Sequence, residues 1–147
     1  MKTRMVLPLV LVLLLLAAGA NAQDARHGTL KNVTGVVTVG SGDTLRTAAP
    51  GGGVTQADRI LTGPGASAAL ALKDGTLLMV GPDAMLELTT VQFDSTTQEG
   101  NLVVNLLKGS VRMVTGWLAK MHPEQVRVTT PTSVVGVRGT DFIVEVP

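Results

Sequence analysis

Short runs of alternating apolar and polar residues make up most of the chain from residue 33 onward. The clearest two runs lie on either side of Asp74-Gly75, a pair that suits a tight hairpin turn. No long stretch shows the period of a helix. The pattern predicts β-strands at residues 33–39, 59–62, 67–73, 76–80, 84–91, 101–107, 110–114, 125–129 and 141–146.

Turn residues recur about every ten residues along this part of the chain, a spacing typical of all-β domains. We therefore predict an all-β fold whose short strands form a solenoid-like or jelly-roll arrangement, with a two-sheet β-sandwich as the alternative. Apolar positions that alternate with polar ones predict the core, which comprises Val37, Leu61, Leu70, Leu72, Leu86, Leu88, Val104, Leu106, Val111, Val126, Val128, Phe142 and Val144.

Two segments depart from the strand pattern. Residues 40–57 are rich in glycine and predict a flexible surface loop. Residues 116–123 predict a helical turn and contain the only tryptophan of the chain, Trp117. Two interpretations of Trp117 stay open. It is either an exposed anchor for a partner, together with Leu118 and Met121, or a cap folded onto the core.

The N-terminus has a different pattern. Residues 6–18 are almost wholly aliphatic and follow a short positive segment. Ala20 and Ala22 then match the small-x-small sequence that signal peptidase recognises. We predict a signal peptide over residues 1–22 that is cleaved before Gln23.

This division predicts a domain outside the cytoplasm. After cleavage, residues 23–32 form a flexible tail, and residues 33–147 form one β domain that is periplasmic or secreted. In the alternative, the apolar segment stays uncleaved and anchors the domain in the inner membrane, facing the periplasm. The segment is short for this, because a stable span needs roughly 20 apolar residues.

Composition argues against several classes of function. Cleavage removes two of the 12 basic residues and none of the 11 acidic ones, so the formal charge falls from +1 to −1. A near-neutral domain lacks the positive surface that binds nucleic acid. Aromatic residues make up 2% of the chain, which argues against stacking grooves for single strands. Because there is no cysteine, the domain must fold on apolar burial alone.

No arrangement of residues typical of an enzyme or a metal site stands out. His27 and His122 are the only histidines, and neither has a further ligand at metal-binding spacing. The chain contains neither Gly-x-Ser-x-Gly nor the Gly-Lys-Ser/Thr of a phosphate loop. Asp74 and Asp83 lie beside glycine or proline, where aspartate stabilises turns. We predict a non-enzymatic protein without a cofactor or a metal.

Several segments, in order along the chain, resemble the FecR domain. The most specific is Val-Arg-Gly-Thr-x-Phe near the C-terminus, which follows a Thr-Pro pair. The matching segments are residues 33–39, 57–63, 68–76, 106–111, 130–132 and 137–142. The resemblance implies structural roles for the motif residues Asp74, Gly75, Gly109, Thr130, Pro131, Val137, Arg138, Gly139, Thr140 and Phe142.

Four of these motif residues carry specific expectations. Gly139 is expected to allow a backbone geometry that a Cβ atom would block, and Phe142 to enter the core. Pro131 suits a strand edge or a turn. Arg138 is expected to bond carbonyl groups across the fold, and a contact on the surface is the alternative.

The resemblance also implies a function. FecR proteins of Gram-negative bacteria typically relay an iron-siderophore signal from an outer-membrane transporter to a cytoplasmic sigma factor of the extracytoplasmic-function class. Only residues 1–5 precede the apolar run here, and the chain stops at Pro147. We therefore expect a scaffold or interaction module of the bacterial cell envelope that binds an unidentified envelope protein or polymer, and no nucleic acid. The alternative is a component of iron-siderophore signalling that acts with separate partners.

Overall fold

The structure is a computed structural model that describes residues 26–138 and 141–147. The predicted signal peptide, its cleavage site at Ala20, Ala22 and Gln23, and the motif residues Gly139 and Thr140 lie outside the described residues. In the part that is described, no helix has the length and apolar character needed to cross a membrane.

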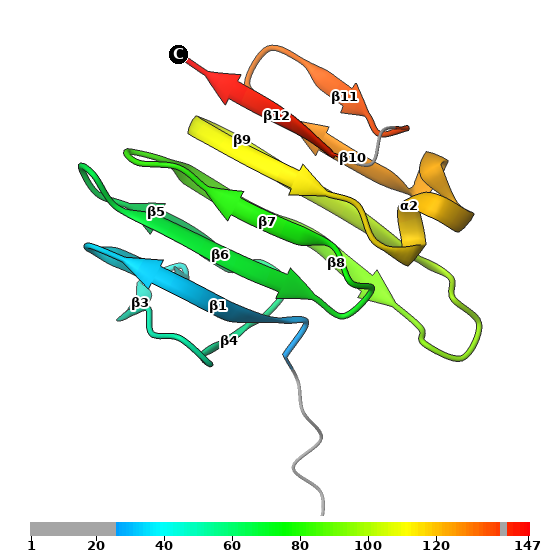
Figure 1. Ribbon diagram of the computed structural model, residues 1–147, viewed down its shortest axis with the longest axis horizontal. Coiled ribbons are helices and arrows are strands. Elements are labelled where there is room, and N and C mark those ends of the chain that lie inside the picture. Colours follow the sequence, from blue (N-terminus) through cyan, green and yellow to red (C-terminus); the bar gives the residue numbers. More distant parts are fainter. Residues whose placement is uncertain (1–25, 139–140) are drawn as a thin grey trace, which may run out of the picture.

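Strands make up most of the described chain, and the prediction of an all-β fold is confirmed (Figure 1). A short helix α2 (Trp117–Met121) and a 3₁₀ turn η1 (Pro123–Gln125) interrupt them. The strands are β1 (Gly28–Thr34), β2 (Val37–Ser41), β3 (Thr44–Thr47), β4 (Gly53–Val54), β5 (Arg59–Thr62), β6 (Ser67–Leu72), β7 (Leu77–Val80), β8 (Met85–Phe93), β9 (Gly100–Val114), β10 (Val126–Thr129), β11 (Val134–Gly136) and β12 (Asp141–Val146).

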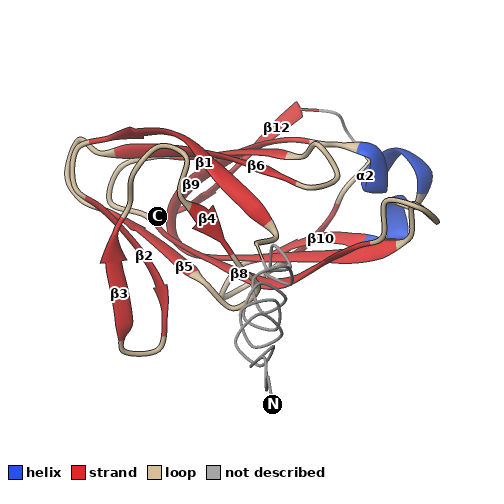
Figure 2. Ribbon diagram, turned by 90° about the horizontal axis from the view of Figure 1, so that it is seen from below, coloured by secondary structure: helices blue, strands red, loops and turns tan. Residues whose placement is uncertain are grey.

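The strands join into one curled sheet of the order β3-β2-β5-β8-β9-β7-β6-β1-β4, a half-barrel with two facing layers (Figure 2). The long strand β9 belongs to both layers. Its first part pairs with β8 and β10, and its second part pairs with β7 and β12. Neighbouring strands are antiparallel except β9 and β10, so hairpins and crossovers build the sheet rather than stacked parallel coils.

Gly109 lies where β9 passes from one layer to the other. Its φ of +85° is a conformation that residues with a Cβ atom rarely adopt. A Cβ atom at this position would also lie 2.5 Å from the Cβ of Ala84. The structural role predicted for this motif glycine is therefore to let β9 bend while it packs closely on the segment before β8.

The core fills the space between the two layers. Most of the predicted core residues are fully buried there, among them Leu70, Leu86 and Val104. The prediction that Leu61 belongs to the core is wrong. Ile60 and Thr62 point inward on β5, so Leu61 lies half-buried on the other face of the strand. Phe142 and Val144 are also only half-buried, since they lie on β12 at the edge of the sheet.

Two further predictions need correction. Residues 28–32, assigned to a flexible tail, belong to β1, which pairs with β4 and β6. Residues 40–57, assigned to a loop, contain β3 and β4 and bury Val54 completely. Both segments contain few apolar residues, so their strands depend on pairing with distant parts of the chain rather than on a local pattern.

An ion pair at the surface joins β12 to β9. The Arg112 Nε atom donates a hydrogen bond to Asp141 Oδ1 at 2.8 Å, and Arg112 Nη2 donates to Asp141 Oδ2. This hydrogen bonding lowers the pKa of the Asp141 carboxyl group below its usual value. Because folding lowers this pKa, the ion pair stabilises the fold at pH values above the pKa of Asp141 in the unfolded chain. This contribution is lost as the pH falls through the pKa of Asp141 in the folded protein.

We expect the Asp141 carboxylate to titrate at a lower pH in the wild-type protein than in an Arg112→Gln variant, as followed by NMR of the carboxyl carbon. The stability of the two proteins at neutral pH should differ little, because the side chains are 50% and 43% exposed. Identical titration curves would show that the pair does not persist in solution.

Candidate interaction site

The turn between β6 and β7 contains a buried network of hydrogen bonds, which we call the knot. The Asp74 carboxylate, 4% exposed, accepts one hydrogen bond from the Thr76 amide at 3.0 Å and one from the Thr76 hydroxyl at 2.8 Å. Gly75 lies between them with a positive φ. The predicted turn role of Asp74 and Gly75 thus takes the form of a closed, desolvated turn.

This turn holds the start of α2. The Gly116 amide donates to the Thr76 hydroxyl at 3.2 Å, and the Trp117 amide donates to the Asp74 carbonyl at 2.9 Å. Gly116 packs so closely that an added Cβ atom would lie 2.3 Å from the Asp74 carbonyl oxygen. The knot therefore fixes where the chain leaves β9 and which way α2 points.

Helix α2 buries Leu118 in the core and exposes Trp117, Lys120 and Met121 to solvent. Leu118 is 1% exposed and closes one end of the core. The prediction that it contacts a partner is therefore wrong. Trp117 and Met121, one helical turn apart, are 55% and 53% exposed. The interpretation of Trp117 as a buried cap is therefore excluded. Figure 2 shows α2 at the end of the half-barrel, between the two layers.

A cation completes this surface. The Lys120 Nζ atom lies 5.6 Å from the centre of the Trp117 ring, within the range of a cation–π interaction. We call Trp117, Lys120 and Met121 the Trp117 patch. It combines apolar area with one positive charge, on a helix whose position is fixed by Leu118 and by the β6–β7 turn.

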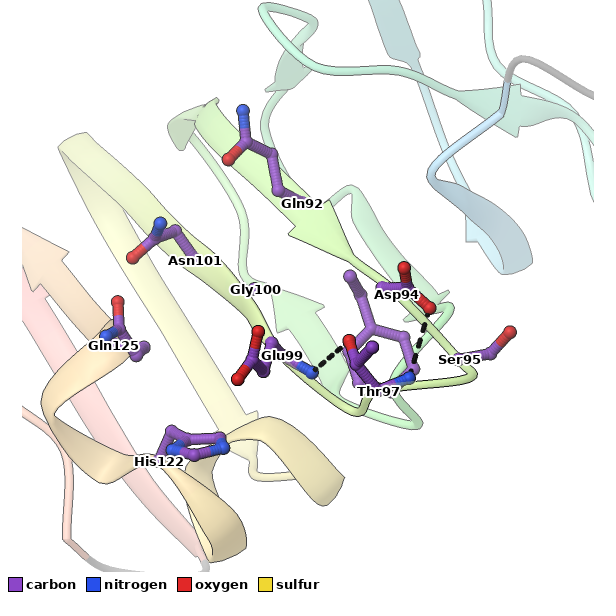
Figure 3. Close-up of a pocket in the computed structure, with 10 residues that line it drawn as sticks. Gln92, Asp94, Ser95, Thr97, Glu99, Gly100, Asn101, His122 and Gln125 are labelled. Carbon is purple, nitrogen blue, oxygen red and sulfur yellow. Dashed lines mark hydrogen bonds between the residues drawn. The ribbon is translucent and has the colours of Figure 1, made fainter.

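A polar recess of about 940 Å³ lies between the β8–β9 hairpin and the segment that contains η1 (Figure 3). Asp94 stabilises the turn of this hairpin, since its Oδ1 atom accepts hydrogen bonds from the amides of Thr96 and Thr97. The recess is lined by Gln92, Phe93, Asp94, Ser95, Thr97, Glu99, Gly100, Asn101, His122 and Gln125.

The side chains that line the recess offer donors and acceptors of hydrogen bonds. Figure 3 shows His122 on the opposite side from Ser95, and the two side chains do not meet. His122 Nδ1 lies 3.5 Å from Glu124 Oε1, outside the lining. In residues 26–138 and 141–147, no three histidine or carboxylate side chains are grouped so that they could hold a metal. Sequence reasoning missed this recess because no local motif marks it.

The other motif residues lie around the C-terminal strands. Thr130 and Pro131 form the turn between β10 and β11, where the Thr130 amide donates to the Ser133 carbonyl at 2.9 Å. Val137 is buried. Arg138 is exposed, and among the described residues it makes no bridge across the fold, which favours the alternative of a surface position.

Comparison with known proteins identifies a family and a partial structural likeness. No curated protein matches the chain. A solved structure described as a "Cell surface anchoring domain" is 30% identical over 42% of this chain and 83% of its own, with a TM-score of 0.40. The FecR protein family matches residues 58–146, which include both the β6–β7 turn and α2. The chain therefore belongs to the FecR family, as the sequence motifs predict.

Proposed function

We propose that this FecR domain is a non-enzymatic interaction module of the bacterial cell envelope that binds a partner through the Trp117 patch. The observation that carries the proposal is that Trp117 is 55% exposed on a helix anchored by the buried Leu118. An exposed tryptophan on a rigid support is typical of binding hot spots, because its large area is presented without a cost in ordering.

The kind of partner follows from the surface around the patch. Trp117 and Met121 offer apolar area, and Lys120 adds a positive charge. The neighbouring polar recess adds amide groups that donate and accept hydrogen bonds. These features support, as the partner, an envelope protein or polymer that carries an apolar group beside an acidic or carbonyl-rich segment. The predicted signal peptide and the family membership support a location outside the cytoplasm.

The proposal predicts that Trp117→Ala weakens partner capture without unfolding the domain. Because the side chain is more than half exposed, the melting temperature should change little. Loss of a hot spot costs about 2 kcal/mol of binding free energy, which corresponds to roughly a 30-fold weaker complex. The measurement is capture from an envelope extract by tagged protein, with mass spectrometry to identify the partner, followed by titration of that partner.

Leu45→Ala is the matched control. Leu45 lies on β3, is 51% exposed, and is thus an apolar side chain of similar exposure at the far end of the half-barrel (Figure 2). It should leave both stability and capture unchanged. Equal capture by the wild-type protein and Trp117→Ala would remove the Trp117 patch from the proposal.

Membership of the FecR family supports a second candidate function, a component of iron-siderophore signalling that acts with separately encoded partners. A sigma-factor gene of the extracytoplasmic-function class beside the gene for this protein would favour it. Under this candidate, deletion of the gene should abolish transcription induced by the siderophore. Unchanged induction after deletion would leave only the first candidate.

A further inference from the structure

A groove of about 690 Å³ lies between β11 and β12, where the half-barrel does not close. Within the described residues, β11 pairs only with β10 and β12 only with β9, so each strand has a free edge. Figure 1 shows the two strands close together at the C-terminal end of the sheet. We call this space the β11–β12 groove.

The opposite side of the half-barrel is covered by the chain itself. There the Leu30 amide donates to the Gly52 carbonyl at 2.8 Å, and the Gly51 amide donates to the Leu30 carbonyl at 2.8 Å. The Ala48 amide donates to the Val37 carbonyl at 2.9 Å, and Val54 is fully buried. Residues 48–54 thus satisfy strand edges on that side. No described segment does the same for β12, whose outward amide and carbonyl groups remain available.

Apolar side chains of β11 and β12 line the groove and are incompletely covered, together with the polar residues Thr130, Thr132 and Ser133 and the charged residues Arg138 and Glu145. Phe142, Val144 and Val146 lie at alternate positions of β12, are half-buried, and pack against the core. Val135 of β11 has the same half-buried state. An added strand would cover these four side chains, and burial of apolar area favours its binding.

Two charged side chains line the groove, Arg138 between β11 and β12 and Glu145 on β12, and the position of Glu145 on the strand bears on which strand can be added. Asp141 is already paired with Arg112, whereas Glu145 forms no ion pair with any described residue. Asp141, Ile143 and Glu145 share the exposed face of the strand. Antiparallel pairing of two β12 strands about Ile143 would set Glu145 opposite Asp141 of the second copy, and this register is disfavoured because like charges directly opposite each other are destabilising. A strand with a lysine or arginine opposite Glu145 is favoured.

We propose that the β11–β12 groove binds an extended segment of another protein by β-strand addition. The segment places alternate apolar side chains over Phe142, Val144 and Val146 and a basic side chain beside Glu145. Main-chain hydrogen bonds to β12 supply affinity, and the alternating side chains supply specificity. This site is separate from the Trp117 patch and does not depend on it.

The test uses capped hexapeptides that alternate valine with threonine, with one threonine replaced by lysine, titrated into the purified protein. Amide signals of β11 and β12 should shift in NMR spectra, and those of α2 should not. Replacing the lysine of the peptide by glutamate should weaken binding about threefold to tenfold. In an added strand, every second peptide amide points toward β12. N-methylation of that set should weaken binding at least tenfold, because several main-chain hydrogen bonds are lost, whereas N-methylation of the other set should not.

A charge swap gives the sharpest readout. Glu145→Lys should reverse the preference, so that the glutamate peptide binds better than the lysine peptide, and this exposed substitution should leave the fold intact. Trp117→Ala should bind both peptides like the wild-type protein, which separates this proposal from that for the Trp117 patch. The proposal is overturned by absence of binding, by equal binding of N-methylated peptides from both sets, or by a stable dimer that forms through β12.

Discussion

Gly116→Ala is expected to lower the free energy of unfolding by about 3 kcal/mol. An alanine Cβ atom would lie 2.3 Å from the Asp74 carbonyl oxygen and 2.5 Å from the Thr76 amide nitrogen, both of which are main-chain atoms. Overpacking of this kind costs roughly 1–3 kcal/mol, and each hydrogen bond lost from the knot adds about 1 kcal/mol. Urea denaturation measures the change, and the fluorescence of the single tryptophan reports the displacement of α2 directly.

Gly136→Ala provides the control for this substitution. Gly136 has an ordinary φ, and no atom of the described residues lies within 4 Å of an added Cβ atom. Alanine at this position should change stability by less than about 0.5 kcal/mol. If Gly116→Ala were as stable as Gly136→Ala, the contact between the β6–β7 turn and α2 would not hold the helix in place.

The sequence predicts the hairpin of β6 and β7 correctly, because both strands alternate and meet at a turn. It fails at residues 33–39, which a turn at Gly35 divides between β1 and β2, and at Gly109, through which β9 continues as one strand. Leu70 and Leu72 precede Asp74-Gly75, and their inward direction follows from alternation alone. Leu61 could not be placed in this way, because it stands beside Ile60 and a strand of two adjacent apolar residues fits either face. The placement of β1 depends on its pairing with β6, which no local pattern encodes.

The candidate site shows the same limit more strongly. Trp117 and Leu118 are adjacent on a short helix, so only one of them can point into the core. The choice is made by hydrogen bonds between Gly116 and the β6–β7 turn, 40 residues earlier in the chain. Composition alone favours burial of either side chain.

Leu118→Ala is expected to have the second large effect, a loss of about 2–5 kcal/mol in the free energy of unfolding. Leu118 is 1% exposed and is the α2 side chain that closes the end of the core. Truncation removes its apolar contacts and leaves a cavity between the two layers. Thermal and urea denaturation should both report the loss, with a melting temperature lowered by several degrees.

Two substitutions on the same helix make this result specific. Leu118→Met keeps the volume and should cost less than about 1.5 kcal/mol. Trp117→Ala, although it removes a larger side chain, should cost far less than Leu118→Ala because more than half of the indole is already in water. If the order were reversed, so that Trp117→Ala was the more destabilising substitution, the indole and not Leu118 would close the core in solution. The Trp117 patch would then be unavailable to a partner, since binding and folding would compete for the same side chain.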